Sequence, residues 1–428
     1  MTSGRAPGGL SIAIVGAGIG GLAAAASLQR IGMEVQLYEQ AGQFARVGAG
    51  IQMAPNAMKV LRGLGLEERL RAIAFEPPSG LNRDHDTGKV TNELPIGTQM
   101  NDRFGAPYLL MHRADLHTAL ASLVPDAILH LGKKLTDLSQ DSDGVTLHFA
   151  DGSEARADLV VAADGVHSRV REIMLGKETP RFTGKVAYRT TFPSALLRDT
   201  QIAASRTKWW GPDRHIVIYY VTRAQDEIYF VTSQSEEAGW MTPESWSAKG
   251  DVDELRRAYA SFHPEVRAVL DACPDVHKWA LLERDPLPTW RQNRVVLLGD
   301  ACHPMTPYMA QGAANARRAR SEQPSHRSAG HRGCDERRPR PCRDSDVGIR
   351  VARAYGHHRC RQASRCDGSA GAVRVRQRSR GHPHAVLKYH HASAARIRMA
   401  APRRIRGVRE RRARGVMGGP AMASFASV

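Results

Sequence analysis

Cysteine is scarce in this chain, which has six in 428 residues, and only Cys273 and Cys302 precede residue 317. Two thiols cannot form a disulfide framework for a body of this size, so a disulfide-stapled secreted protein is excluded and a reducing, cytoplasmic setting is expected. The other four cysteines lack the CxxC spacing of a zinc site, and the histidines around them are scattered. We therefore expect no metal.

Long hydrophobic runs are also missing. The first ten residues, MTSGRAPGGL, contain no apolar core of a secretory signal, and none is expected. Residues 10–28 are the most apolar stretch, but glycines interrupt them where a strand gives way to a helix, which argues against a membrane-spanning helix. The sequence predicts no contact with a membrane.

Acidic residues are sparse only at the C-terminal end. Residues 317–428 hold 27 arginines and one lysine against seven acidic residues, whereas residues 1–316 hold 33 basic and 36 acidic residues. Clustered arginine can neutralise nucleic-acid phosphates, but this tail has few aromatic residues and no recognition motif, so no nucleic-acid partner is expected. Low hydrophobicity with high net charge predicts that the tail, residues 317–428, is disordered.

The most informative stretch is residues 12–40, IAIVGAGIGGLAAAASLQRIGMEVQLYEQ. An apolar strand leads into glycines in GxGxxG spacing, an Ala/Leu-rich helix follows, and a second strand over 34–38 ends at Glu39. This order is the dinucleotide-binding pattern, in which an acidic residue accepts hydrogen bonds from a ribose. The alternative for a GxGxxG alone is an ordinary turn between a strand and a helix.

Each glycine has a physical role in this pattern. Gly16 permits the tight turn out of the strand, and Gly18 has no Cβ, so the backbone there can approach a pyrophosphate. Gly21 allows the helix and strand to pack closely. The pyrophosphate then meets free N–H groups at the positive end of the helix dipole.

Two further buried strands end in the same way. Residues 158–163 lead into Asp164 and Gly165, and residues 294–298 lead into Gly299 and Asp300. In an open parallel sheet, ligands bind outside the carboxyl ends of the strands. We therefore expect the glycine turn, Asp164 and Asp300 to meet in one crevice.

Residues 183–234 have a different composition. Three β-branched and aromatic runs, separated by short polar turns, predict an antiparallel sheet in a second domain. His215 and Tyr219 would share one face of a strand. Residues 251–270 predict one amphipathic helix, residues 75–105 are polar and irregular, and the glycine-rich 46–56 segment suits either a flat ligand or a plain surface loop.

The three strand-end motifs together resemble the class A flavoprotein monooxygenases, single-component FAD enzymes that hydroxylate aromatic rings. GAGIGG with Glu39, VVAADGVHSRVR and RVVLLGDACHPMTPYMAQGAA carry the resemblance over residues 10–314. Within the class, KWWGPDRHIVIYYVT, EIYFVT and RDPLPTW are most similar to the 6-hydroxynicotinate 3-monooxygenases and, more distantly, the salicylate hydroxylases. The predicted fold is α/β: a Rossmann-like FAD-binding domain (8–176 and 286–316) with an antiparallel substrate domain (177–285).

The resemblance implies roles at matching positions. FAD would be held by Gly16, Gly18, Gly20, Gly21, Glu39, Gln40, Arg113, Leu135, Asp164, Asp300, Gly312 and Ala313. Tyr219 and His215 would be the catalytic residues facing the substrate, with Tyr219 favouring its phenolate form. For both, a packed strand residue is the structural alternative.

The implied reaction consumes NADH or NADPH and O₂ and passes through a flavin hydroperoxide. The substrate would be a hydroxylated aromatic or pyridine carboxylate such as 6-hydroxynicotinate, hydroxylated with or without decarboxylation. Gln52, close to flavin and substrate, replaces a histidine of the hydroxynicotinate enzymes and cannot carry a proton at neutral pH. A salicylate or hydroxybenzoate hydroxylase, and an NAD(P)-dependent dehydrogenase, are the alternatives. The protein would be a monomer or homodimer.

The tail departs from the family. From Asn315, arginine replaces the apolar periodicity expected of the helices that close the flavin site. A shifted reading frame in the coding DNA is one hypothesis, and it implies a catalytically impaired FAD-binding protein. Translation of the neighbouring frames would restore the family's helices if the hypothesis is right.

Overall fold

The computed structural model describes residues 9–46, 49–198, 200–236 and 248–316. The predictions about the tail, residues 317–428, lie outside these residues. Among the helices described, none has both the length and the apolar character needed to cross a membrane.

A six-stranded sheet forms the first layer. Its strand order is β17-β18-β11-β1-β2-β7, and every neighbouring pair is parallel except β17 with β18. Four of its strands were predicted, namely β1 (Ser11–Val15), β2 (Glu34–Tyr38), β11 (Leu159–Ala162) and β18 (Val295–Leu297). The other two, β7 (Leu129–His130) and β17 (Arg291–Gln292), were not. The strands that lead into the glycine turn, Asp164 and Asp300 are thus adjacent, as the sequence predicts.

Alternating side chains on β1 divide the packing into two cores. Ile12 and Ile14 face a core shared with the helices, whereas Ala13 and Val15 face the opposite core. Burial of both faces is typical of parallel sheets. The helices of this part of the chain are α1 (Ile19–Arg30), α2 (Pro55–Gly63), α3 (Glu67–Ile73), α4 (Thr98–Phe104), α5 (Arg113–Ala121), η1 (Asp126–Ile128) and α6 (Arg169–Leu175).

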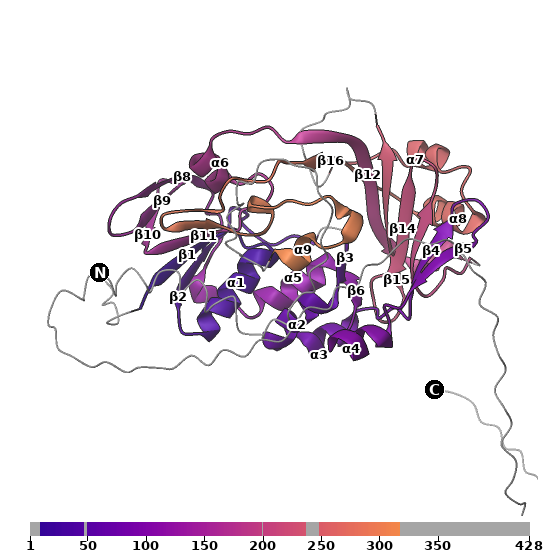
Figure 1. The fold of residues 1–428 in the computed structure, drawn as a ribbon, viewed down its shortest axis with the longest axis horizontal. Helices are drawn as coiled ribbons and strands as arrows, with labels where there is room; N and C mark the ends of the chain where they lie inside the picture. The colour runs from indigo at the N-terminus through magenta and orange to yellow at the C-terminus, as the bar shows by residue number, and fades with distance from the viewer. Residues whose placement is uncertain (1–8, 47–48, 199, 237–247, 317–428) are drawn as a thin grey trace, which may run out of the picture. The chain divides into compact units, whose positions relative to one another are not determined.

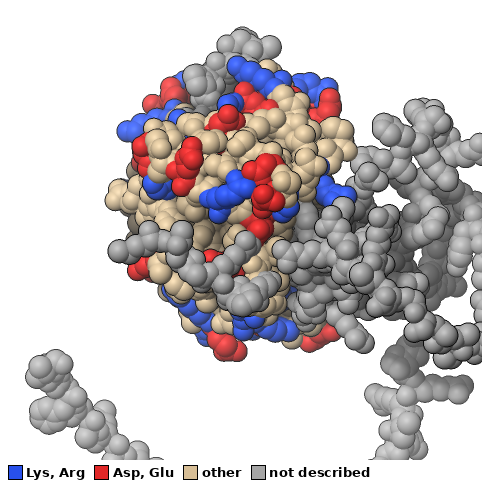
Figure 2. Space-filling model, turned by 90° about the vertical axis from the view of Figure 1, so that its left-hand side faces the viewer, with Lys and Arg blue, Asp and Glu red and all other residues tan. Residues whose placement is uncertain are grey.

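A three-stranded antiparallel sheet covers the second core. Its strands are β8 (Leu135–Gln140), β9 (Val145–Phe149) and β10 (Glu154–Ala157). The connections between them contain the turn dipeptides Asp143-Gly144 and Asp151-Gly152. Its rim carries ion pairs, including Lys133 with Asp151 at 2.6 Å and Arg156 with Asp141 at 2.8 Å. On the face shown in Figure 2, basic and acidic side chains are interspersed, unlike the single-sign stripe of a nucleic-acid-binding surface.

A seven-stranded sheet forms the second part of the fold, on the right in Figure 1. Its order is β16-β12-β15-β14-β13-β4-β5, and the five strands from the predicted second domain pair antiparallel. Their bounds are β12 (Arg181–Pro193), β13 (Arg206–Trp210), β14 (His215–Tyr220), β15 (Glu227–Ser235) and β16 (His277–Glu283). The short helix η2 (Ser194–Leu197) follows β12.

The prediction of irregular structure over residues 75–105 is wrong. This segment contains α4 and two strands, β4 (Gly80–Asp84), parallel to β13, and β5 (Val90–Leu94), antiparallel to β4. The sequence from 80 to 94 therefore extends the second sheet, although the predicted domain boundaries assign it to the first. The β5 side chains are exposed, which is why this edge has no apolar pattern to read.

The prediction of one helix over residues 251–270 is also wrong. Two helices, α7 (Val252–Ala258) and α8 (Pro264–Ala272), occupy this range. Proline has no N–H to continue a helix but is favoured in a first turn, so Pro264 begins a new one. Both helices pack on the outer face of the second sheet, against a core that includes Trp209, Ile216 and Phe230.

Neighbouring side chains on β14 point in opposite directions. Ile216 and Ile218 face the helix-covered core, whereas Val217 and Tyr219 face the other way, toward a small pair of strands, β3 (Gly50–Met53) and β6 (Leu109–His112). The glycine-rich 46–56 segment therefore contains a strand, and a plain loop is excluded for residues 50–53. After β18, the last described segment of the chain runs between the two large sheets, in orange in Figure 1. It contains η3 (Gly299–Ala301), η4 (Pro307–Met309) and α9 (Gly312–Asn315).

Asp158 offers a test of how the first sheet is held together. Its carboxylate accepts hydrogen bonds from the backbone N–H of Ser11, at 2.8 Å, and from the Ser11 hydroxyl, at 3.0 Å, and so joins β1 to β11. We expect Asp158→Ala to lower the free energy of unfolding by about 1–3 kcal/mol, because the half-buried N–H and hydroxyl of Ser11 lose their acceptor. Urea unfolding measures this, with the exposed Asp102→Ala as control; equal stability of the two variants would contradict it.

Candidate active site

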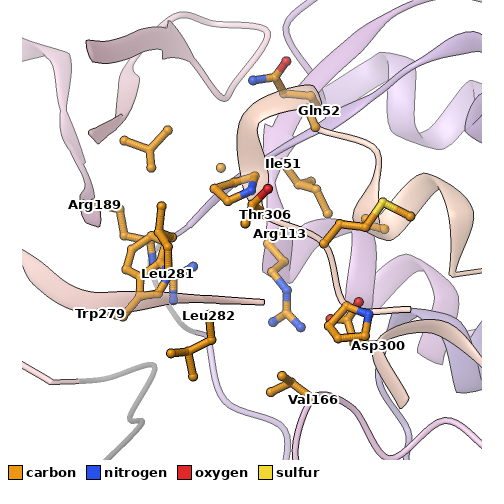
Figure 3. A pocket seen from close by; sticks show the side chains of 18 of the residues that line it. Ile51, Gln52, Arg113, Val166, Arg189, Trp279, Leu281, Leu282, Asp300 and Thr306 are labelled. Atoms are coloured by element: carbon orange, nitrogen blue, oxygen red, sulfur yellow. The ribbon is translucent and has the colours of Figure 1, made fainter. Parts of the chain in front are cut away.

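A cavity of about 300 Å³ lies where the second sheet faces β3 and the segment after β18. Six of the residues predicted from the sequence to serve the site line it; they are Gln52, Arg113, Tyr219, Asp300, Gly312 and Ala313. Figure 3 shows Gln52, Arg113 and Asp300 around this space. Residues separated by more than 250 positions therefore meet at one place.

The glycine turn has the geometry that its spacing predicts. Gly16 has a φ of +98°, a conformation that side chains rarely adopt, and a Cβ on Gly21 would lie 1.8 Å from the Gly16 carbonyl oxygen. A Cβ on Gly18, in contrast, would meet no atom within 4 Å. The open space therefore lies at the glycine where a pyrophosphate would approach.

The N-terminus of α1 provides the donors for that pyrophosphate. Gly18 is its N-cap and no side chain caps the first turn, so the first N–H groups of this 12-residue helix have no side-chain acceptor. Such an end attracts anions. Gly20, unlike Gly18, is not next to open space, because a Cβ on Gly20 would lie 3.3 Å from the carbonyl oxygen of Ala316. These features fit an FAD diphosphate.

Glu39 binds the glycine turn itself. Its carboxylate accepts hydrogen bonds from the N–H of Ala17, at 2.7 Å, and of Ala41, at 2.9 Å. Each carboxylate oxygen keeps a further acceptor site, so the predicted ribose contact is compatible with this arrangement. Gln40 is exposed beside it, and the Leu135 side chain is buried in the core with Tyr38, which leaves only its backbone for a ligand.

Asp164 lies under the glycine turn and not in the cavity wall. A Cβ on Gly16 would be 3.0 Å from its Cα, and its carboxylate accepts a hydrogen bond from the N–H of Val170 at 3.0 Å. Burial raises the pKa of Asp164, while hydrogen bonds from Ser168 and Val170 oppose the rise. In this structure Asp164 therefore fixes the start of α6, and its contact with FAD remains a prediction.

Arg113 and Asp300 form the charged end of the cavity. Burial lowers the pKa of Arg113, and the charge of Asp300 opposes that change. Burial likewise raises the pKa of Asp300, against the charges of His303 and Arg113. By its accessible surface Arg113 is an exposed residue, and it lines the cavity. The pair offers one cation and one acceptor to a polar ligand.

Tyr219 lies in an aromatic and amide cluster on the opposite wall. Its ring centroid is 5.1 Å from that of Tyr229, and it shares a side-chain hydrogen bond with Gln52. Gln52 in turn accepts a hydrogen bond from the Tyr108 hydroxyl at 2.6 Å. Burial raises the pKa of Tyr219 well above its ordinary value, so the phenol is neutral at physiological pH.

His215 does not line the cavity with Tyr219, contrary to prediction. The two share a face of β14, but the His215 ring lies against Trp210, at 5.1 Å, and Tyr308, at 5.8 Å. Burial, aided by the charges of Lys208 and Lys185, lowers the pKa of His215 to about 3. A neutral imidazole outside the cavity is poorly placed to act on a substrate.

The residues of the cavity and the Tyr219 cluster that the sequence did not single out include Tyr108, Arg189, Tyr229 and Trp279. Arg189 and Tyr229 lie in strands that the sequence predicts. The alternation of side chains along a strand places each residue on one of two faces, but it does not tell which face lines the cavity. Tyr108 lies between the segment predicted to be irregular, residues 75–105, and β6, where the sequence made no prediction. No local signal marks Trp279.

These observations agree with comparisons with known proteins, which match residues up to about 316. The model of the FAD binding domain family matches residues 10–316, so the chain belongs to that family. It is an FAD-dependent aromatic-ring monooxygenase, a class that takes electrons from a nicotinamide cofactor.

Among curated proteins, it is 47% identical over 305 residues to the 6-hydroxynicotinate 3-monooxygenase of Bordetella bronchiseptica, a match that covers 71% of this chain and 79% of the relative. The enzyme of the same name from Pseudomonas fluorescens is 45% identical over 306 residues, 71% of this chain and 79% of the relative.

Solved structures give the same assignment. Klebsiella pneumoniae HpxO complexed with FAD and uric acid superposes with a TM-score of 0.64 at 27% identity, over 72% of this chain and 77% of that one. A salicylate hydroxylase substrate complex superposes with a TM-score of 0.62 at 28% identity, over 73% and 78%. The predictions of fold class, FAD and enzyme class are confirmed.

Gly18 and Gly21 make a matched pair for testing the cofactor site. Gly21→Ala forces a Cβ onto the Gly16 carbonyl oxygen, and we expect a loss of stability of about 1–3 kcal/mol or more. Gly18→Ala meets open space, so we expect an unchanged melting temperature but weaker FAD binding, roughly 10- to 100-fold if a hydrogen bond is displaced. Thermal melts and FAD titration separate the two; unchanged FAD affinity in Gly18→Ala would remove this glycine from the site.

His215 predicts a pH effect on stability. Its pKa is about 3 in the folded protein and near 6.5 when unfolded, so between these values the unfolded chain binds more protons and stability falls as pH falls. We expect His215→Asn to lose less stability than the parent between pH 7.5 and pH 5. Urea unfolding at both pH values measures this. An imidazole that titrates near pH 6.5 by NMR in the folded protein is the contrary result.

Proposed function

We propose that this enzyme hydroxylates a hydroxylated aromatic or pyridine carboxylate of the 6-hydroxynicotinate kind. The observation that carries the proposal is the cavity, which combines Arg113 and Asp300 of the predicted flavin site with Tyr219 of the second sheet. The names of the two relatives at 45–47% identity support the substrate class.

FAD, when bound, supplies two-electron transfer from NADH or NADPH and the activation of O₂. The protein's own residues must hold the ring and exclude water. Val231, Trp279 and Leu281 give the cavity an apolar wall. Glycine at position 50 is required for this wall, because a Cβ there would lie 2.6 Å from the Tyr229 ring and 2.8 Å from the Tyr219 hydroxyl oxygen.

Tyr219 is the residue we assign to the substrate hydroxyl. Since its phenol stays protonated, it acts as a hydrogen-bond donor, and a donor stabilises a substrate oxyanion over the neutral form. Gln52 holds the phenol in place but cannot exchange protons with it. The substrate hydroxyl therefore loses its proton to solvent or to a group that enters the site together with the substrate. Tyr219 then stabilises the resulting phenolate.

The experiment that tests the function is a substrate screen. Purified protein loaded with FAD is given hydroxylated benzoates and hydroxylated pyridine carboxylates, and nicotinamide consumption and product are recorded together. We expect 6-hydroxynicotinate to be converted, with or without loss of its carboxyl group as CO₂. Conversion of salicylate or 3-hydroxybenzoate alone would favour the alternative hydroxylases; no product from any acid would refute the proposal.

We further propose that O₂, NAD(P)H and the aromatic acid are the only partners the reaction needs, and that the enzyme works in the cytoplasm. A monomer or homodimer remains the expected state, which light scattering would measure.

Tyr219→Phe removes the hydroxyl while keeping the ring. We expect the hydroxylation rate to fall about 100-fold, because the substrate oxyanion loses the hydrogen bond donated by the Tyr219 hydroxyl. Nicotinamide oxidation should continue, with O₂ reduced to hydrogen peroxide. Tyr220→Phe is the control: this neighbour on β14 packs against Phe75, at 5.7 Å, outside the cavity lining. Hydroxylation unchanged at every pH in Tyr219→Phe would end the assignment.

A further inference from the structure

Arg189 stands on the same sheet face as Tyr219. In the antiparallel register, Arg189 is opposite Val231 and Tyr219 is opposite Tyr229. Directly opposite residues share a face, and all four line the cavity. Arg189 is only 7% exposed, so this guanidinium is presented to the cavity and not to the outer surface.

Packing fixes the orientation of this guanidinium. Its central carbon lies 4.3 Å from the centre of the Trp279 ring, which reaches over from β16. Stacking on an aromatic face holds the planar fork in place, and a held fork binds a carboxylate with two parallel hydrogen bonds. In Figure 3, Arg189 and Trp279 lie on one side of Arg113, and Asp300 lies on the other.

The other cations of the lining are placed differently. Lys278 forms ion pairs with Glu236, at 2.7 Å, and Glu254, at 3.2 Å, and Arg113 faces Asp300 at the predicted flavin end. Lys278 is opposite Tyr188, which packs in the helix-covered core, so among the described lining residues Arg189 is the cation on the Tyr219 face of the second sheet. Its charge also acts on Tyr229, where it opposes the rise of that pKa to about 12 caused by burial.

We propose that Arg189 binds the substrate carboxylate while Tyr219 binds the ring hydroxyl, so that the enzyme prefers acids whose hydroxyl is para to the carboxylate. This rests on the proposed function. From Arg189 to Tyr219 there are two strand spacings across and two residue steps along the sheet, a separation of about 12 Å between the Cα atoms. Para substituents lie farther apart on a six-membered ring than meta or ortho substituents, so the para isomer best suits two residues this far apart on the sheet face.

The test is binding to the full, FAD-loaded chain, followed by flavin absorbance. The probes are 6-hydroxynicotinate, its primary amide, and the 4-, 3- and 2-hydroxybenzoates. We expect Arg189→Gln to weaken 6-hydroxynicotinate binding about 100-fold and binding of the amide less than about threefold. Arg189→Lys, which keeps the charge but not the fork, should fall between. Among the hydroxybenzoates, the 4-isomer should bind tightest.

Lys185→Gln is the matched control, because this lysine lies on the same strand and face but hydrogen-bonds the Asp213 carbonyl and the Ser235 hydroxyl outside the cavity. It should leave both affinities unchanged. Equal loss of acid and amide binding in Arg189→Gln, or equal affinity for the three isomers, would overturn the assignment. If Arg189→Gln does not fold, Arg189→Lys and the isomer series decide.

The two proposals fail in different ways. Acids that bind with the predicted selectivity but are never hydroxylated would refute the function and leave the Arg189 anchor standing. Hydroxylation of 6-hydroxynicotinate with undiminished affinity in Arg189→Gln would refute the anchor alone. Absence of binding by every acid would overturn both.

Discussion

The close contact between Gly16 and Gly21 is the constraint on which the site depends. With only 1.8 Å between the Gly16 carbonyl oxygen and the position of a Cβ on residue 21, the first turn of α1 lies directly on the end of β1. That contact aims the N-terminus of α1 at the open space beside Gly18. Strand β1 also pairs with β11, and β11 pairs with β18, so the carboxyl ends of the three strands lie side by side. This pairing sets the positions of Asp164 and Asp300, which follow β11 and β18, relative to the glycine turn.

The second sheet borders the cavity with one of its faces, whereas the first sheet borders it with the carboxyl ends of its strands. Strand ends present backbone N–H groups and short acidic side chains, which suit a cofactor with phosphates and hydroxyls. A sheet face presents alternating side chains, and here these include Tyr219, Tyr229 and Arg189. The cavity lies where edge and face meet, so cofactor chemistry and substrate choice are set by different parts of the chain.

Much of this could be predicted from the sequence, since the relevant signals are local. The GxGxxG turn, the acidic residue after β2 and the Gly-Asp ends of the strands are short motifs whose geometry follows from glycine and from strand direction. The cavity walls were not predictable in the same way. Whether Arg189 or Tyr188 faces the cavity depends on which sheet face the helices cover, and α7 and α8 settle that only in three dimensions. His215 shows the reverse case: it has the right face, but Trp210 and Tyr308 enclose it.

The central claim is that the cavity holds an aromatic acid where a reduced flavin can transfer oxygen to it. The most direct measurement is a reaction of the FAD-loaded protein with 6-hydroxynicotinate and NADH under isotopically labelled O₂, with the product analysed by mass spectrometry. The account predicts one labelled oxygen atom in the ring product for each nicotinamide oxidised in the coupled reaction. A product without label, or nicotinamide oxidation that yields hydrogen peroxide alone, would contradict it.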